Sequence, residues 1–469
     1  MTLIIILLTR GATHSDSIDK GLDMEMPGGL FFGTKLSNSI SSGELDISFV
    51  DDSVMRILTP MFAVGIMDDV NDNTLDNDVT SESHSQFARV LSSSSQVLLK
   101  NENNILPLSK SNPSKIAIFG KSAIQPVIGG GGSGAVFPPY VSTPYEGIAS
   151  ALSIPLPKMS LTCNTTVIKN VKINQYGCQS SPGESFEDCD EQCGKLFSCN
   201  AFSYENGRCG FYPTTNELRP SKNGVVGECV KEVPSSSWQC NDAGLCIAYH
   251  DGVDLESATS LAKQADINII AISQFAKEGS DRDNLSFDGK ASTTCQYVPP
   301  NQDTLVSTIA AVDKPTVVTA TVPGAVLMPW RDQVDAIVIA SMPGQEYGNA
   351  LADTLLGVSN PSAKLTFTMP NKENEVGLSI FQYPGIFREE AYLERSKIDY
   401  RWYTANNVVP AYPFGHGLSY TTFEYSGLSI DDNKVTVTGN NDTFNDTIHT
   451  DNDYYYSYHS CKHRESCWF

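Results

Sequence analysis

A charged turn past the middle of the chain carries side chains that could perform proton-transfer chemistry. The sequence Lys-Glu-Gly-Ser-Asp-Arg places Glu278, Asp281 and Arg282 within five residues. A carboxyl group such as that of Glu278 can act as a general acid or base when it reaches a substrate oxygen. Gly279 permits close approach of the backbone to a ligand, and Asp281 and Arg282 can pair and fix the loop. Without further context, a solvated charged turn is the better interpretation.

Two other patterns suggest chemistry that their details exclude. The run GGGGSG (129–134) lacks the Gly-Lys-Ser/Thr ending of a phosphate cradle, so nucleotide binding is not expected. The spacing Cys189-x₃-Cys193-x₅-Cys199-x₉-Cys209 lacks the Cys-x₂-Cys pair or the terminal histidine pair of a zinc site. Disulfides are therefore favoured, and no metal or organic cofactor is expected.

The cysteines indicate an oxidising compartment. The chain has 12 cysteines, and seven of them are disulfide candidates in one stretch, namely Cys163, Cys178, Cys189, Cys193, Cys199, Cys209 and Cys229. Four glycosylation sequons agree with this interpretation, at Asn164, Asn284, Asn441 and Asn445. The apolar run Leu3–Leu8 is too short for a signal peptide. We expect an extracellular or secretory-pathway protein, with the disulfide connectivity left open.

The overall charge narrows the class of partner. With 54 acidic and 32 basic residues, the formal net charge is −22 at pH 7, which opposes binding to a nucleic-acid backbone. A neutral or cationic ligand fits better, although an acidic surface also serves solubility alone. No apolar run reaches the roughly eighteen residues of a membrane span.

Short apolar runs separated by helical patterns predict an α/β fold. The runs at 115–120, 267–273, 315–322 and 334–341 are apolar throughout, as expected of strands covered on both faces. Residues 304–312 and 344–358 have helical periodicity, as do 50–65 and 85–101. The last of these would place Phe87, Val90, Leu91, Val97 and Leu98 largely on one helix face. Residues 21–29 predict a turn, and 434–439 alternate like a strand.

Five ordered segments resemble glycoside hydrolase family three. They are GATHSDSIDKGLDMEMPGG (11–29), VLLKNENNILPL (97–108), KEGSDRDNLSFDG (277–289), MPGQEYGNALADTLLGVSNPSAKLTFTMP (342–370) and DYRWYTANNVVPAYPFGHGLSYTTFEYS (399–426). The resemblance is to β-glucosidase-type members. It implies a (β/α)₈-type barrel, a six-stranded α/β sandwich and a fibronectin type III-like domain, of which the sandwich is present in full.

With 469 residues the chain is long enough for two to four domains. We expect a barrel remnant at 1–66, a linker at 67–84, the α/β sandwich at 85–158 and 241–420, a cysteine-rich insert at 159–240, and a truncated fibronectin-like start with an irregular tail at 421–469. An interrupted gene sequence explains the early start better than a genuine truncated protein does.

The resemblance also implies roles for individual residues. A retaining glycosidase needs two carboxyl groups about 5 to 5.5 Å apart, one as nucleophile and one as acid/base. Glu278 aligns with the family's acid/base. Thr9 occupies the position of the nucleophilic aspartate in Ser-Asp-Trp-Gly, so the covalent step is missing. The nearby carboxylates Asp16, Asp19 and Asp23 lie in the wrong part of the loop to replace it.

The insert resembles PAN/apple modules, chiefly in its cysteine spacing and an Ala-Phe-Ser-Tyr strand. Such modules bind proteins or carbohydrates, and a decoration without a ligand is an equal alternative. Trp238, Trp330 and Trp402 could stack on sugars, but core packing fits each better. The preferred function is hydrolysis of terminal non-reducing β-D-glucosyl residues of a β-glucoside or oligosaccharide, with Asp281 and Arg282 near the substrate. The alternative is a non-catalytic carbohydrate- or protein-binding protein. Glucoside against xyloside preference and oligomeric state stay open.

Overall fold

The structure is a computed structural model of the chain, and it forms two compact units. Unit 1 comprises Met1–Thr80 and Leu378–Leu393, and unit 2 comprises Ser81–Gly377 and Glu394–Phe469. The structure describes residues 5–7, 18, 21–26, 32–68, 79–108, 113–131, 136, 138–156, 164–173, 179–182, 185–195, 201–205, 208–212, 218–230, 236–278, 281–288, 299–386, 390–422, 425–431 and 434–439.

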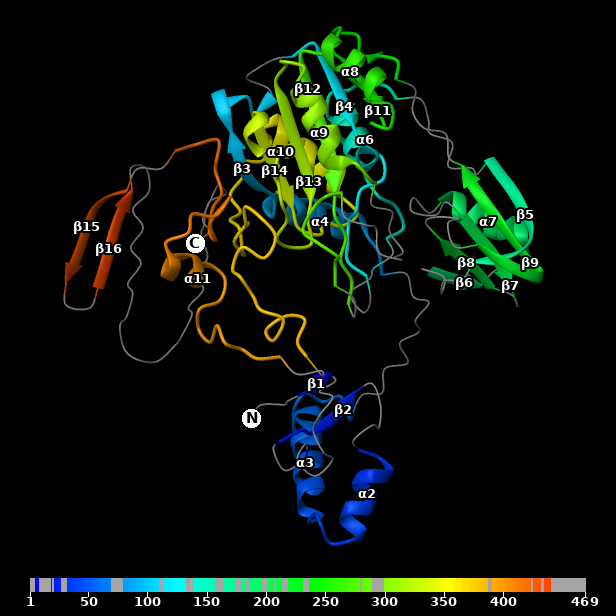
Figure 1. The fold of residues 1–469 in the computed structure, drawn as a ribbon, viewed down its shortest axis with the longest axis vertical. Coiled ribbons are helices and arrows are strands. Elements are labelled where there is room, and N and C mark those ends of the chain that lie inside the picture. The colour runs from blue at the N-terminus through cyan, green and yellow to red at the C-terminus, as the bar shows by residue number, and fades with distance from the viewer. Residues whose placement is uncertain are drawn as a thin grey trace. The chain divides into compact units, whose positions relative to one another are not determined.

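The described residues of unit 1 include a parallel strand pair and the helices α2 and α3 (Figure 1). Strand β1 (Ile5–Leu7) pairs with β2 (Met24–Met26), and the helices are α2 (Thr34–Ser41) and α3 (Ser48–Ala63). The helical pattern at 50–65 is confirmed by α3. The segment predicted as a turn contains β2 instead, because Met24 and Met26 gain a hydrogen-bonding partner strand that local sequence cannot reveal.

An ion pair fixes the end of β2 to α3. The Nε atom of Arg56 lies 2.7 Å from Oδ1 of Asp23, and the Asp23 side chain is only 1 % exposed. Hydrogen bonding to Asp23 raises the pKa of Arg56. Several large apolar side chains of this unit are exposed, among them Val54, Met55, Phe62, Ile66 and Met67.

A seven-stranded sheet organises unit 2. Its order is β10-β11-β4-β12-β13-β14-β3, as Figure 1 shows for most strands. The strands are β3 (Val97–Asn101), β4 (Lys115–Phe119), β10 (Gln239–Cys240), β11 (Cys246–His250), β12 (Ile267–Ser273), β13 (Thr316–Thr321) and β14 (Ala336–Ala340). Strands β11, β4, β12, β13 and β14 run parallel, while β10 and β3 are antiparallel edges.

Helices cover both faces of this sheet and create two apolar cores. Helices α8 (Leu255–Gln264) and α9 (Gln302–Ala310) supply Leu261, Leu305 and Ile309 to one core. Helices α6 (Pro144–Ala151) and α10 (Tyr347–Leu356) supply residues such as Ile148 and Leu351 to the other. Helix α10 ends at Gly357 in the left-handed conformation, as expected of a C-terminal glycine. The α/β fold predicted from continuous apolar runs is therefore confirmed.

The edge of the sheet differs from the helix predicted at 85–101. Helix α4 (Glu82–Ser94) begins after the capping residue Ser81 and ends within a run of four serines, and the chain then enters β3. Phe87, Val90 and Leu91 are exposed on α4, whereas Val97 and Leu98 are buried by pairing with β14. Tertiary pairing overrides a helical periodicity that continued across the junction. Strand β11 was not predicted, and the resemblance implied six strands rather than seven.

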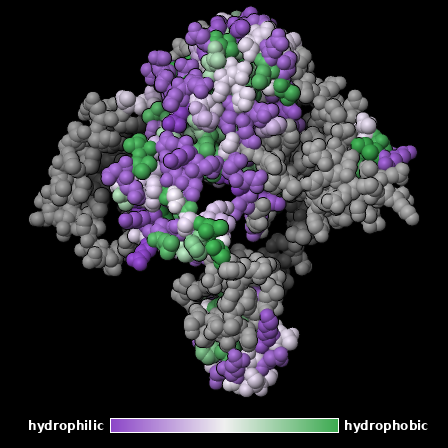
Figure 2. Space-filling view, in the orientation of Figure 1, coloured by the Kyte–Doolittle hydropathy of each residue, from purple (hydrophilic) through white to green (hydrophobic). Residues whose placement is uncertain are grey.

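Several short elements also belong to the described part of unit 2. They are the 3₁₀ turns η1 (Glu102–Asn104), η2 (Lys121–Ala123) and η4 (Arg331–Gln333), helix α11 (Tyr400–Asn406), and the hairpin β15 (Tyr425–Asp431) and β16 (Lys434–Gly439). The strand predicted at 434–439 is confirmed by β16. No helix in the described residues has the length and apolar character needed to cross a membrane. Figure 2 shows a largely hydrophilic face over the seven-stranded sheet, with scattered hydrophobic patches.

The cysteine-rich segment folds into its own antiparallel sheet. The order is β5-β9-β7-β8-β6, with α7 packed against β7, and the elements are β5 (Asn164–Ile173), β6 (Gln179–Pro182), α7 (Phe186–Lys195), β7 (Ala201–Glu205), β8 (Arg208–Tyr212) and β9 (Leu218–Val230). Both cysteines of the Cys189–Cys209 disulfide are fully buried beside Phe202. Cys193 is also disulfide-bonded.

The other cysteine predictions of this segment stay open. Cys163, Cys178 and Cys199 lie outside the described residues, and Cys229 is described only as part of the backbone of β9. A second disulfide joins Cys240 to Cys246, two residues that were not among the candidates.

Helices α6 and α10 approach so closely that two glycines are required at their contact. A Cβ atom on Gly348 would lie 1.9 Å from the carbonyl oxygen of Thr143, and one on Gly147 would lie 2.2 Å from the backbone of Gly348. The amide of Gly348 also donates to the carbonyl of Ser142 at 2.8 Å. This contact therefore sets the distance between the two helices.

Replacing Gly348 with alanine should destabilise the protein. We expect Gly348→Ala to lower the free energy of unfolding by about 1 to 3 kcal/mol, because the clash with backbone atoms exceeds the roughly 1 kcal/mol that alanine gains in a helix. Chemical denaturation provides the measurement. Gly324→Ala is the control, since no heavy atom lies within 4 Å of its added Cβ. Equal stability of the two variants would contradict the close contact.

Candidate active site

The order of the parallel strands marks one edge of the sheet as a binding position. The chain runs from β4 to β11 on one side and then crosses to β12 on the other side of β4. In open α/β sheets, ligands bind at the carboxyl ends of the strands where this direction reverses. The loops after Phe119 and after Ser273 are therefore the expected position of a site.

Glu278 lies in the second of these loops and is tied to the first. Gly131 forms a parallel bridge with Lys277. The amide of Gly131 donates to the carbonyl of Ala276 at 3.2 Å, and the amide of Glu278 donates to the carbonyl of Gly131 at 3.3 Å. The Glu278 residue itself is exposed. The backbone of the predicted acid/base is thus held in an exposed position.

Only glycine fits this approach of the two loops without rearrangement. A Cβ atom on Gly131 would lie 2.9 Å from Cβ of Lys277 and 2.9 Å from the ring of Phe275. Residues 129–131 of the run GGGGSG are described, and 132–135 lie outside the described residues. Within the described part of the run, loop packing therefore requires glycine at Gly131.

Side-chain amides hold the rest of the Glu278 loop. Gln302 is buried and bonds both backbone groups of Ser273 at 2.9 Å, and it also donates to the carbonyl of Phe287 at 2.9 Å. Gln274 donates to the carbonyl of Ser286 at 2.6 Å. These bonds connect Ser273 and Gln274, at the end of β12, to residues 286–287 in the described part of the loop.

Two further contacts fix the loop from outside. The amide of Leu285 donates to Oε1 of Glu373 at 2.6 Å, and the amide of Leu327 donates to the carbonyl of Leu285 at 2.9 Å. Sequence reasoning missed Gln302 and Glu373 because they are distant in the chain and carry no motif of their own.

The ends of the glycine-rich loop are clamped to the turn before α10. The amide of Gly344 donates to the carbonyl of Ile128 at 2.9 Å. The hydroxyl of Tyr140 donates to Glu346, whose other carboxylate oxygen accepts a 2.7 Å hydrogen bond from Asn349. Glu346 is only 5 % exposed. The turn in MPGQEYGN thus positions the loop that holds Glu278, a role the sequence did not reveal.

Arg282 has a different partner from the one predicted. Its Nη2 atom donates to the carbonyl of Ala325 at 2.8 Å, and among the described residues it forms no ion pair with Asp281, which is exposed. Burial lowers the pKa of Arg282, and its Nη1 atom is buried without a hydrogen-bond partner. The pairing expected from adjacency fails because the guanidinium turns inward, toward the loop after β13.

The residues predicted around the nucleophile are only partly described. Thr9, Asp16 and Asp19 lie outside the described residues. Asp23 is buried and paired with Arg56, so its carboxylate already serves unit 1. The structure therefore leaves the predicted substitution at Thr9 untested.

The tryptophans mainly pack. Trp330 is fully buried, and Trp238 packs against the same core while the Lys115 ammonium lies 5.3 Å from its ring centroid. Trp402 contacts Tyr403 edge to face. In the part of the chain that the structure describes, no group of three or more His, Cys, Asp or Glu residues could hold a metal ion.

Comparison with known proteins assigns the same region to one family. Residues 96–420 match the family described as Glycosyl hydrolase family 3 C-terminal domain. The chain is 28 % identical to "Thermostable beta-glucosidase B" of Acetivibrio thermocellus over 89 % of its own length and 43 % of that protein. It is 28 % identical to "Probable beta-glucosidase I" of Aspergillus niger, covering 89 % of this chain and 60 % of that one.

A solved structure supports the likeness. The beta-D-glucoside glucohydrolase of Trichoderma reesei superposes with a TM-score of 0.61 at 26 % identity, covering 91 % of this chain and 50 % of that one. The chain therefore spans about half the length of the proteins it matches.

The end of the Glu278 loop depends on a buried carboxyl group. Asp303 accepts hydrogen bonds from Nε1 of Trp330 at 2.7 Å and from Oγ of Ser286 at 2.8 Å. Burial raises the pKa of Asp303. The native state therefore keeps this proton at pH values where the unfolded chain has lost it. The stabilisation is complete below the unfolded pKa and is lost as pH rises through the folded pKa.

Asp303→Asn should remove this dependence on pH. As pH rises from about 4, the unfolding free energy of the unsubstituted protein should fall relative to that of the variant. Only the unsubstituted protein must bury an ionised carboxylate in its folded state. Denaturation curves at stepwise pH measure the difference. The control is Asp332→Asn, whose original side chain is 85 % exposed. If both variants followed the same curve, burial would not govern the titration of Asp303.

Proposed function

Because the chain belongs to glycoside hydrolase family 3, we propose that it carries the acid/base half of a β-glucosidase site, with Glu278 as the acid/base. The substrates would be terminal non-reducing β-D-glucosyl residues of β-glucosides or oligosaccharides. One observation supports this most strongly: the backbone bonds between Gly131 and residues 276–278 hold Glu278 beside the strand-order reversal. The similarity to beta-glucosidases supports the substrate class.

The retaining mechanism assigns Glu278 two successive tasks. It first protonates the oxygen of the leaving group, and it then removes a proton from the water that releases the sugar. An exposed carboxyl group on a fixed backbone suits both tasks, because its side chain can reach the substrate while its origin stays in place. In this proposal Asp281 and the inward-turned Arg282 shape the loop near the substrate.

The proposed departure from the family concerns the nucleophile. By resemblance, Thr9 stands where the family has aspartate, and a threonine hydroxyl without an adjacent base is a poor nucleophile. Asp23 does not offer a substitute, since its carboxylate is buried against Arg56. We therefore propose that this chain does not complete the covalent step.

The two disulfides support a proposal about the compartment, and the elements support one about the domains. Cys189–Cys209 and Cys240–Cys246 favour an oxidising environment, and we propose a secreted glycoprotein. We also propose that 1–66 is part of a barrel, that 159–240 is an insert within the sandwich, and that the hairpin β15–β16 begins a fibronectin-like domain.

A second function is favoured by the insert. Its sheet, with the buried Cys189–Cys209 disulfide, has a core of its own, as a PAN/apple-like binding module would. On this alternative the protein binds a carbohydrate or protein without turnover.

The 469-residue chain should not hydrolyse an aryl β-glucoside. Release of the aryl group, followed by absorbance, should stay at the level of a Glu278→Gln control. Turnover that Glu278→Gln abolishes would contradict the proposal of a missing nucleophile. Saturable sugar binding without turnover, measured by calorimetry, would favour the binding function.

A form with a complete barrel and aspartate at position 9 tests Glu278 itself. There, Glu278→Ala should slow glucosides with poor leaving groups far more than activated aryl glucosides, because only the former need protonation. The comparison of kcat/KM for the two substrate types measures this. Equal losses would remove Glu278 from the acid/base role.

A further inference from the structure

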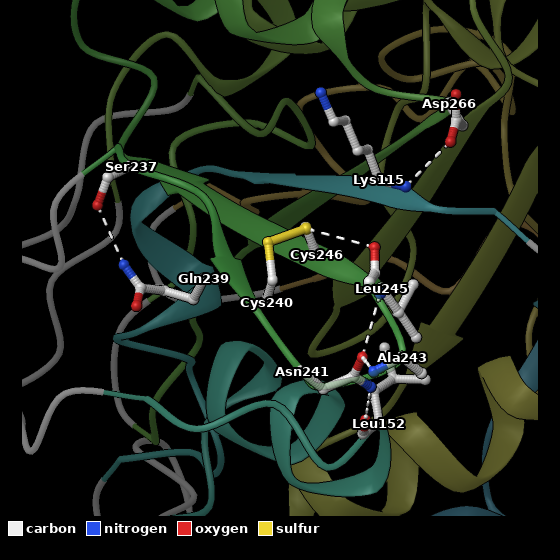
Figure 3. Close-up of a disulfide and its surroundings, with 11 residues drawn as sticks. Lys115, Leu152, Ser237, Gln239, Cys240, Asn241, Ala243, Leu245, Cys246 and Asp266 are labelled. Atoms are coloured by element: carbon white, nitrogen blue, oxygen red, sulfur yellow. Dashed lines mark hydrogen bonds between the residues drawn. A yellow bond between two sulfur atoms is a disulfide. The ribbon is translucent and has the colours of Figure 1, made fainter.

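The short hairpin that follows the insert contains a disulfide in an unusual setting (Figure 3). Cys240 in β10 and Cys246 in β11 are direct partners in an antiparallel register, six residues apart in sequence. The amide of Asn241 donates to the carbonyl of Leu245 at 3.0 Å. The adjacent pair, Cys240 and Cys246, is therefore a non-hydrogen-bonded pair. Such pairs bring Cα atoms closest, and the two cysteine Cα atoms are 4.0 Å apart.

The two cysteines differ in exposure. Cys240 is exposed and lies on the two-residue edge strand β10, whereas Cys246 is only 7 % exposed. A thiol from solution can therefore approach the Cys240 side of the bond. The Cys189–Cys209 disulfide provides the contrast within the same chain, because both of its cysteines are fully buried. Access decides which sulfur a thiolate can attack.

We propose that Cys240–Cys246 is a thiol–disulfide exchange site for low-molecular-weight thiols of the glutathione class. The thiolate attacks Sγ of Cys240, a mixed disulfide forms, and the electron pair of the broken bond passes to Sγ of Cys246, which takes a proton from water. A second thiolate then attacks the sulfur of the bound small thiol, and the bond from that sulfur to Sγ of Cys240 breaks. Its electron pair stays on Sγ of Cys240, which takes a proton from water. The small thiol leaves as its oxidised disulfide, and both cysteines are reduced.

The surroundings are suited to the reduced state. Sγ of Cys246 lies 3.5 Å from the carbonyl oxygen of Gly244. Within the disulfide this sulfur has no hydrogen to donate, but the thiol formed by reduction can donate one to that carbonyl. Reduction therefore gains a hydrogen bond that the oxidised form lacks.

Hydrogen bonds from the Asn241 side chain to the backbone hold the hairpin closed independently of the disulfide. Oδ1 of Asn241 accepts from the amides of Ala243 at 3.0 Å and Leu245 at 3.1 Å, and its Nδ2 donates to the carbonyl of Leu152 at 2.8 Å (Figure 3). Strand β11 is in turn paired with β4. The two thiols consequently stay opposite each other, and the exchange is reversible.

A redox titration of the native chain tests the site. The protein is equilibrated in buffers of graded reduced-to-oxidised glutathione ratio, free thiols are alkylated, and each cysteine is quantified by mass spectrometry. We expect Cys240–Cys246 to be half reduced at a ratio at least about tenfold less reducing than Cys189–Cys209 requires. Circular dichroism at the same ratio should show the native spectrum.

Two results would overturn the proposal. One is reduction of Cys240–Cys246 together with, or after, Cys189–Cys209. The other is alkylation of Cys240 only where the native spectrum is lost, which would make unfolding the route of access. The double variant Cys240→Ser/Cys246→Ser is the control, and its Cys189–Cys209 bond should keep the same midpoint.

Discussion

The candidate site depends on one close approach of backbone to backbone, between Gly131 and residues 276–278. Between their described residues, two backbone hydrogen bonds join the loop after β4 to the loop after β12. A side chain at Gly131 would displace Lys277 or Phe275. Everything else on this edge of the sheet supports that approach: buried Gln302 closes the Glu278 loop, and the turn carrying Glu346 clamps the ends of the glycine-rich loop. The backbone position of Glu278 thus depends on several distant segments acting together.

The sequence predicted those parts of the fold that are encoded locally. Continuous apolar runs identified four strands of the parallel sheet, since strands buried on both faces must be apolar throughout. Helices α3, α9 and α10 followed from their periodicity. The helix predicted at 85–101 was wrong at β3. There Val97 and Leu98 continue the helical spacing of α4, but they are buried in a strand that pairs with β14. For the site, the Glu278 motif was visible, whereas Gln302, Glu346 and the inward turn of Arg282 depend on partners far away in the chain.

The two carboxyl groups of a retaining glycosidase need not share one structural origin. The hydrogen bonds described for the Glu278 loop all come from unit 2, including those from Glu373 and Leu327. These described contacts of the loop are thus made within unit 2. Likeness around one catalytic group supports membership of the family, while activity requires both groups.

The cysteine-rich segment leaves and rejoins the seven-stranded sheet's layers at adjacent points. The chain leaves the sandwich after α6 near Leu152 and returns at β10, and the side chain of Asn241 bonds back to the carbonyl of Leu152 at 2.8 Å. Because departure and return are joined by a direct hydrogen bond, a long segment can be accommodated there without separating α6 from β11. Sites with adjacent ends are those where domain insertion is generally tolerated. The same hairpin carries Cys240 and Cys246, so the chain rejoins the seven-stranded sheet at the disulfide for which thiol exchange is proposed.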